Sequence, residues 1–159
     1  MRLWRHTDVA NLTPGQVATT PAGILAHEWD FRQYDSFDPP GLVWLSSTTV
    51  STYTHHLSLY KHPSGALVFG AGTVNWAWGL DDHHTESRYP PKAGLPPDPR
   101  LQQLTVNVLA EMGVQPATLQ EDLVAFEATG DSTPPVSAIT APAAGDTLLA
   151  GAVAVRGTA

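Results

Sequence analysis

The sequence predicts a β-rich chain of the α/β class with one clear helix, at about residues 98–112. Three observations support this prediction. Apolar and polar side chains alternate over residues 55–60, as they do in a half-buried strand. A short apolar run at 66–69 follows turn-forming residues at 61–65, which is typical of a β-hairpin. A capped, amphipathic segment begins near residue 98.

The composition narrows the class of protein. The 159 residues are 42% hydrophobic and only 14% charged, against about 25% charged in an average domain, so the chain has apolar surface to bury. The net charge of −7 argues against a non-specific nucleic-acid partner. The absence of cysteine excludes disulfide scaffolds, thiolate metal sites and a cysteine nucleophile. No apolar run approaches the ~20 residues of a membrane span.

Several further strands are expected in the first half of the chain. Residues 23–26 predict a short strand that runs into the polar cluster at 27–30. Residues 42–45 predict another strand, and the Ser/Thr-rich stretch 46–54 also favours extended structure. The continuous apolar run at 66–69 suggests that both faces of its strand are covered.

The helix has the strongest local signals in the chain. Asp98 is a good N-cap residue, Pro99 suits the first helical position, and Gly113 suits the residue after the end. Leucine, valine and methionine side chains recur at helical spacing and are expected to pack in the core: Leu101, Leu104, Val108 and Met112.

The C-terminal part differs in composition from the rest. Residues 121–133 are predicted to be a linker, and 134–159 to contain two strands around a turn at 142–146, like the start of an Ig-like sandwich. Two strands cannot close a core, so this Ig-like domain is expected to be truncated. Its presence favours an extracellular or cell-surface location, although residues 1–8 are no signal peptide. Both ends of the chain are expected to be cut from a longer protein.

Glu28 is the most interesting single residue for chemistry. It is followed by Trp29, and an indole beside a carboxyl can exclude water and raise the pKa of the acid, as suits a general acid or base. A surface glutamate next to a packed tryptophan is the alternative.

A weaker constellation lies at residues 81–84. Carboxylate and imidazole are ligands for divalent metals, so Asp81 and His84 are weak metal candidates, and a metal hydrolase using Glu28, Asp81, His83 and His84 is one hypothesis. A solvated loop is the alternative. One histidine of the pair His55 and His56 is expected to face the core and the other the solvent, rather than both binding a ligand. Gly70 and Gly72 permit close backbone approach, either for a ligand or in a plain turn.

Longer stretches of the chain resemble a known family. They include Glu28-Trp29-Asp30, the run from Pro63 to Val74, Trp76-x-Trp78-Gly79-Leu80-Asp81, and residues 103–120. Together with residues 2–15 and 40–50, they resemble the C-terminal part of the N,N-dimethylformamidase large (β) subunit-like domain of long bacterial proteins, over about residues 1–120.

The resemblance implies a fold and an activity. The fold is similar to a glutamine-amidotransferase-like, flavodoxin-like layered sheet. The parent enzyme hydrolyses an amide bond at an iron centre with tyrosine and glutamate ligands, which are expected mostly upstream of Met1. Glu28 would be a substrate-side or acid/base residue, and Trp29, Asn75 and Trp76 would contact substrate. The chain departs from the family pattern at His27, at Asn75 and in a shorter segment at 51–54.

Two functional hypotheses remain open besides the metal hydrolase. In the first, the chain is a fragment of an amidohydrolase-like protein without turnover alone, whose partner is a missing upstream domain of the same polypeptide or a second copy. In the second, it is a non-catalytic carbohydrate- or protein-binding module of a secreted protein, with Trp29, Trp44, Trp76 and Trp78 as a stacking platform. Core packing of these indoles is the alternative.

Overall fold

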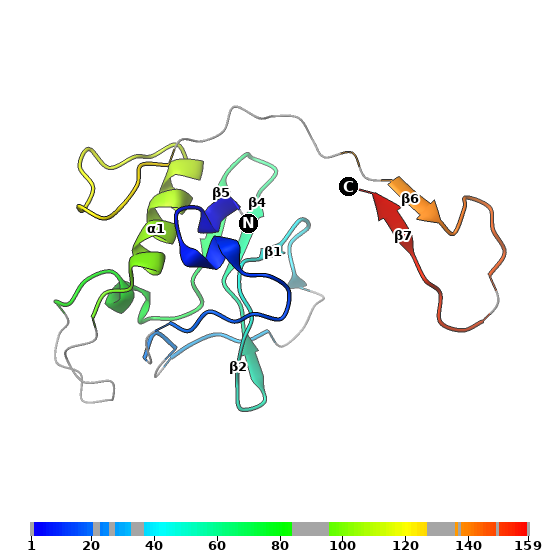
Figure 1. Cartoon of the computed structure of the whole chain (residues 1–159), viewed down its shortest axis with the longest axis horizontal. Helices are drawn as coiled ribbons and strands as arrows, with labels where there is room; N and C mark the ends of the chain where they lie inside the picture. The colour runs from blue at the N-terminus through cyan, green and yellow to red at the C-terminus, as the bar shows by residue number, and fades with distance from the viewer. Residues whose placement is uncertain are drawn as a thin grey trace. The chain divides into compact units, whose positions relative to one another are not determined.

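The computed structural model describes residues 2–20, 23–25, 28–32, 37–83, 96–126, 136, 138–148 and 150–158. The chain divides into two compact units, Met1–Ala128 and Thr129–Ala159 (Figure 1). This division falls inside the segment predicted as a linker, while the predicted family boundary at residue 120 stays a prediction. None of the described helices is long and apolar enough to span a membrane.

The first unit contains two small antiparallel sheets. One has the strand order β1 (Val43–Trp44), β4 (Ser58–Lys61) and β5 (Leu67–Gly70). The other joins β2 (Thr48–Val50) to β3 (Tyr53–His55). The predicted hairpin is confirmed, because β4 and β5 pair across a turn that the His62 amide closes by donating to the Ala66 carbonyl at 2.8 Å.

Helix α1 (Pro99–Glu111) confirms the predicted helix. The Asp98 side chain caps it by accepting a hydrogen bond from the Arg100 amide at 2.9 Å, which satisfies a free amide of the first turn. Gly113 follows the helix with φ of +81°, the left-handed conformation that glycine adopts most easily. The prediction that Met112 packs in the core is wrong. Its side chain is 40% exposed, because the helix ends one residue before it.

The core of the first unit lies between α1, the sheet residues and two short 3₁₀ helices, η1 (Arg2–Trp4) and η4 (Trp76–Gly79). A further 3₁₀ helix, η2 (Asp8–Asn11), follows η1. The Trp4 indole donates to the Leu45 carbonyl at 3.0 Å and so ties η1 to the sheet side of the core. The buried cluster consists of Leu3, Trp4, Ile24, Leu45, Leu57, Leu101, Leu104 and Val108.

The segment after α1 packs on the helix as far as Phe126. Gln103 Nε2 donates to the Val124 carbonyl, and Gln103 Oε1 accepts from the Val124 amide, both at 2.9 Å. The side-chain amide therefore pairs with Val124 as the backbone of a neighbouring strand would. Phe126 is 1% exposed, and the guanidinium groups of Arg2 and Arg5 lie 5.9 and 5.6 Å from its ring centroid. The first part of the predicted linker, residues 121–126, therefore contributes to the first unit.

Two strand predictions are wrong. Residues 23–25 form a turn rather than a strand, and Ala26 and His27 lie outside the described residues. Strand β5 is not covered on both faces, since Val68 is 40% exposed. The described part of the molecule is thus β-rich with one α-helix, and each of its strand pairs is antiparallel.

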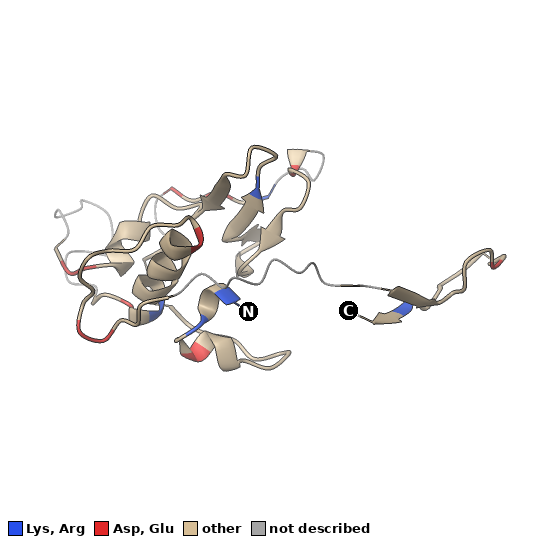
Figure 2. Ribbon diagram, turned by 90° about the horizontal axis from the view of Figure 1, so that it is seen from above, with Lys and Arg blue, Asp and Glu red and all other residues tan. Residues whose placement is uncertain are grey.

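The described residues of the second unit form one strand pair, β6 (Ala138–Ala141) with β7 (Arg156–Thr158). The predicted turn is present, with the Asp146 carboxylate accepting from the Ala143 amide at 2.8 Å. None of its described residues is buried. Figure 2 shows no continuous basic stretch along the described part of the ribbon.

Candidate functional site

The segment 28–32 is held in extended form between two other parts of the first unit. Trp29 forms an antiparallel bridge with Thr73. On either side of it, the Asp30 amide donates to the Gly72 carbonyl at 2.7 Å, and the Val74 amide donates to the Glu28 carbonyl at 3.2 Å. The Arg32 amide lies 3.5 Å from the Thr54 carbonyl of β3. The backbone that carries Glu28 is therefore fixed by segments distant in the sequence.

A hollow of about 780 Å³ lies against this segment. Three of the side chains that line it are aromatic. The rings of Trp29 and Phe31 meet edge to face with centroids 6.1 Å apart, and Phe31 lies 4.3 Å from Tyr53 at an interplanar angle of 43°. The lining residues are Glu28, Trp29, Asp30, Phe31, Tyr53, Gly72, Thr73 and Val74.

The buried histidine beside this hollow is His55. It is 3% exposed, its Nε2 lies 2.9 Å from the Ala71 carbonyl oxygen, and its ring meets the edge of Trp29. Burial lowers the pKa of His55, although the hydrogen bond to Ala71 opposes the shift. A Cβ at Gly72, where φ is +59°, would lie 2.9 Å from His55 Nε2, so this glycine admits the imidazole.

The neighbouring histidine, His56, contacts a different aromatic ring. His56 Nδ1 is 2.9 Å from the Ser46 carbonyl oxygen, and its ring stacks on Trp44 at a centroid distance of 4.1 Å. His56 is half-buried rather than fully solvent-facing. The prediction that one histidine of the pair faces the core is confirmed, and the buried residue is His55.

Asn75 and Trp76 follow Val74 in the chain but are not among the residues that line the Glu28 hollow. Asn75 is 8% exposed, and its side-chain amide donates to the Gly23 carbonyl at 3.1 Å. The Trp76 indole donates to Thr105 Oγ1 at 3.3 Å and packs against the core. The structure thus brings Glu28 and Trp29 together, whereas the substrate-contacting roles of Asn75 and Trp76 stay predictions.

The tryptophans do not share one exposed surface. Trp76 and Trp78 are partly buried against the core cluster, while Trp44 is 40% exposed. A stacking platform needs all four of the indoles that the binding-module hypothesis invokes to be accessible. The packing of Trp76 and Trp78 favours the core alternative for these two residues.

The weak metal candidates do not form a cluster in the described structure. The Asp81 carboxylate accepts from the His83 amide at 2.8 Å, and His83 Nδ1 lies 2.7 Å from Asp82 Oδ1 on the surface. His84 lies outside the described residues. Within the described ranges, no group of three or more histidine, aspartate or glutamate side chains is placed to hold a metal ion.

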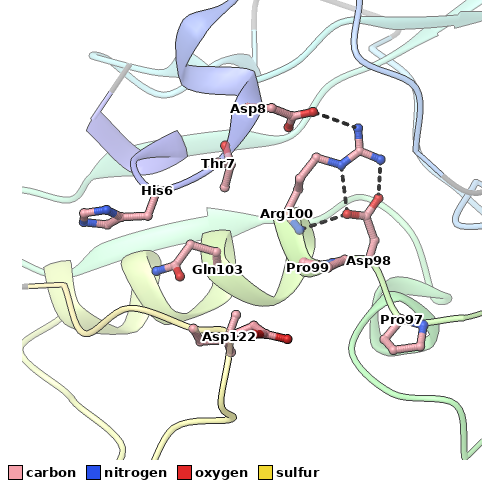
Figure 3. Close-up of a pocket in the computed structure, with 10 residues that line it drawn as sticks. His6, Thr7, Asp8, Pro97, Asp98, Pro99, Arg100, Gln103 and Asp122 are labelled. Atoms are coloured by element: carbon pink, nitrogen blue, oxygen red, sulfur yellow. Dashed lines mark hydrogen bonds and ion pairs between the residues drawn. The ribbon is translucent and has the colours of Figure 1, made fainter.

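A polar hollow of about 460 Å³ lies at the start of α1 (Figure 3). The Arg100 guanidinium points toward Asp98 and Asp8 there, with 2.6 Å from Nη2 to the Asp98 carboxylate and 4.0 Å from Nη1 to that of Asp8. The hydrogen bond to Asp98 raises the pKa of Arg100. The same guanidinium donates to the Thr19 carbonyl at 2.6 Å, so this network anchors the segment before residue 20.

Sequence reasoning missed Phe31 and Tyr53. The signal for Phe31 was present, because Trp29 and Phe31 are two residues apart and share one face of an extended segment. No local signal indicates that Tyr53 joins them, since this contact depends on how β3 lies beside residues 28–32.

Comparison with protein families identifies the class to which this chain belongs. Residues 1–88, more than half of the chain, match the family described as N,N-dimethylformamidase beta subunit-like, C-terminal. The chain is therefore a member of this family. Neither the curated proteins nor the solved structures include a match to it.

Proposed function

We propose that this chain is the C-terminal part of an amide hydrolase of the N,N-dimethylformamidase type and has no turnover alone. The family match carries this proposal, because residues 1–88 include every residue that lines the Glu28 hollow. The reaction consumes water and converts a tertiary amide into a carboxylate and a secondary ammonium ion. The partner of this chain would be an upstream domain of the same polypeptide, or a second copy of the chain.

Glu28 is the proposed proton-transfer residue. Its backbone carbonyl is fixed by Val74, and its side chain shares the hollow with the Trp29 indole. A carboxyl group that a fixed backbone holds beside an apolar side chain can move a proton between water and the leaving nitrogen of an amide. Trp29 would contact the substrate in the same hollow, and Asn75 and Trp76 would support it from the neighbouring turn.

The iron centre of the resembled enzyme does not fit the described residues of this chain. They include no group of three or more suitable histidine or carboxylate ligands. We therefore propose that the ligands of the family's iron lie on the upstream domain.

The remaining fold assignments are part of the same proposal. Strands β1, β4 and β5 would be an edge of a glutamine-amidotransferase-like layered sheet, consistent with the exposure of Val43, Trp44 and Val68. The β6–β7 pair would be the start of an Ig-like domain, and such a domain would place the protein at the cell surface or outside the cell.

The reading frame upstream of Met1 and an activity assay test this proposal together. Dimethylamine release from N,N-dimethylformamide is measured for the 159-residue chain and for the polypeptide extended upstream. We expect turnover only from the extended protein, and a loss of at least ~100-fold when Glu28→Gln removes the proton-transfer group.

Glu121→Gln is the matched control, because Glu121 is an exposed glutamate that does not line the hollow. Full activity of the Glu28→Gln protein would remove Glu28 from the mechanism. An upstream frame without family sequence, combined with a cooperatively unfolding monomer of the chain alone, would contradict the fragment hypothesis.

A further inference from the structure

We propose that the hollow lined by Glu28, Trp29, Asp30, Phe31 and Tyr53 binds an alkylammonium cation. This site, the ammonium hollow, is also lined by residues 72–74. The inference about binding depends on the hollow alone, and only the role given to it in a reaction rests on the proposed function.

The arrangement of the rings favours a compact ligand over a flat one. Trp29 and Phe31 are inclined by 65°, and Phe31 and Tyr53 by 43°. Rings inclined in this way do not share one plane, whereas a sugar ring stacks on a single flat face. Methyl groups around a nitrogen give a compact, nearly spherical group that can touch more than one wall.

The charges around the hollow favour a cation. Glu28 and Asp30 are exposed carboxylates, and the described residues that line the hollow include no lysine, arginine or histidine. Aromatic faces attract cations through their negative quadrupole, and the attraction adds to that of the two carboxylates. A neutral apolar ligand would gain only from the rings.

The protein already uses this interaction next to the ammonium hollow. A second hollow shares Phe31 and Tyr53 with it and is also lined by Arg32, Trp44 and His56, among other residues. There the Arg32 guanidinium lies over the Trp44 ring at 4.8 Å from its centroid, while it also pairs with Asp38 at 2.6 Å. In that hollow a cation of the protein itself lies over an aromatic ring beside a carboxylate, which is the combination of groups that an alkylammonium ligand would meet in the ammonium hollow.

The site is held in place before a ligand arrives. The backbone hydrogen bonds at Glu28 and Asp30 fix the segment along residues 72–74, and Trp29 rests against the buried His55 ring. Fixed walls reduce the ordering cost of binding. If the proposed function holds, the cation is the dialkylammonium product of amide hydrolysis, and the hollow retains the leaving amine close to Glu28.

Binding of a cation and of its neutral isostere distinguishes the proposal from simple apolar binding. The 159-residue chain is titrated with choline and with 3,3-dimethylbutan-1-ol, which has the same shape but no charge, and the shifts of the tryptophan indole NMR signals are followed. Dimethylammonium is titrated as the product-like ligand. We expect choline to bind about two- to fivefold more tightly than the alcohol, a preference typical of exposed cation–π sites.

Charge and ring variants locate the site. The double variant Glu28→Gln and Asp30→Asn should reduce choline affinity and leave the affinity for the alcohol unchanged, whereas Tyr53→Ala should weaken both. The matched control is Glu121→Gln with Asp122→Asn, two exposed carboxylates outside the hollow. The NMR spectrum of each variant without ligand shows whether the fold is retained.

Equal affinity for choline and the alcohol, or no binding of choline to the folded chain, would overturn the proposal. A response of the control variant equal to that of the double variant would overturn it as well. These outcomes are separate from those for the proposed function, because binding is measured without turnover. Choline binding without amide hydrolysis in the extended protein would reject the proposed function and leave the ammonium hollow in place.

Discussion

His55 is a buried imidazole whose surroundings favour its neutral form. It lies beneath Trp29 with Nε2 at 2.9 Å from the Ala71 carbonyl oxygen, and burial lowers its pKa. The unfolded chain, in which the pKa is near 6.5, therefore binds a proton more readily than the folded chain does. Below that pH, protonation favours the unfolded state.

We expect acidification from pH 7.5 to pH 5.5 to lower the free energy of unfolding through His55. The loss begins as the pH falls through the unfolded-state pKa and ends below the lower pKa of the folded state. Urea denaturation followed by tryptophan fluorescence measures it. His55→Gln should flatten the pH dependence, while His62→Gln, at an exposed turn position, should not. A steep dependence that persists in His55→Gln would assign it to other groups.

Helix α1 is the element that joins the two ends of the first unit. Asn107, which is 0% exposed, donates through Nδ2 to the carbonyls of Leu3 at 2.8 Å and Arg5 at 2.9 Å. Its Oδ1 accepts from Gln103 at 2.9 Å. One amide therefore satisfies two backbone carbonyls of the N-terminal segment and orients the glutamine that pairs with Val124.

Asn107→Leu should lower the free energy of unfolding by about 2–4 kcal/mol, because each buried carbonyl or amide left without a partner costs about 1–3 kcal/mol. Urea denaturation measures the change. Asn11→Leu, at the exposed end of η2, is the control and should change stability by less than ~0.5 kcal/mol. Similar losses in the two variants would show that the Asn107 amide does not anchor the N-terminal segment.

At the scale of the molecule, the two units differ in what they bury. The first has a core cluster between α1, η1, η4 and the sheet residues. The second has one strand pair, and none of its described side chains is buried, including Ile139 at 71% and Val155 at 66% exposure. Two strands without a packed face are marginally stable in water.

We expect a peptide of residues 129–159 to lack a cooperative thermal transition. Its circular dichroism should change gradually on heating and resemble that of a scrambled peptide of the same composition, which is the matched control. A sigmoidal melt in the native peptide but not in the scrambled one would show that the β6–β7 pair folds without further strands.

The parts of the fold that the sequence predicted correctly are those with local signals. The β4–β5 hairpin follows from the alternation and turn residues within one short stretch, and α1 follows from Asp98, Pro99 and Gly113. The turn at 23–25 was mistaken for a strand, because its apolar residues suit either conformation. What decides between them is distant: Thr73 Oγ1 donates to the Ile24 carbonyl and Asn75 to that of Gly23.

The same distinction applies to the candidate site. Glu28 and Trp29 were found because they are adjacent in the chain. Tyr53 was missed, because only the packing of β3 beside residues 28–32 brings it to Phe31. Metal candidates near residue 81 came from composition alone, and the surface pairing of Asp82 with His83 shows why residue type without geometry is a weak guide.

The hydrogen bonds from Asn107 to Leu3 and Arg5 also affect the order in which parts of the protein can fold during synthesis. They join residues 104 and 102 positions apart. At a synthesis rate of about 5–20 residues per second, the N-terminal segment waits roughly 5–20 s for the helix that will hold it. Leu3 and Trp4, both of which end in the core, are synthesised before α1 and have no helix to pack against during that interval. These residues of the first unit are thus among the last of its core to become protected.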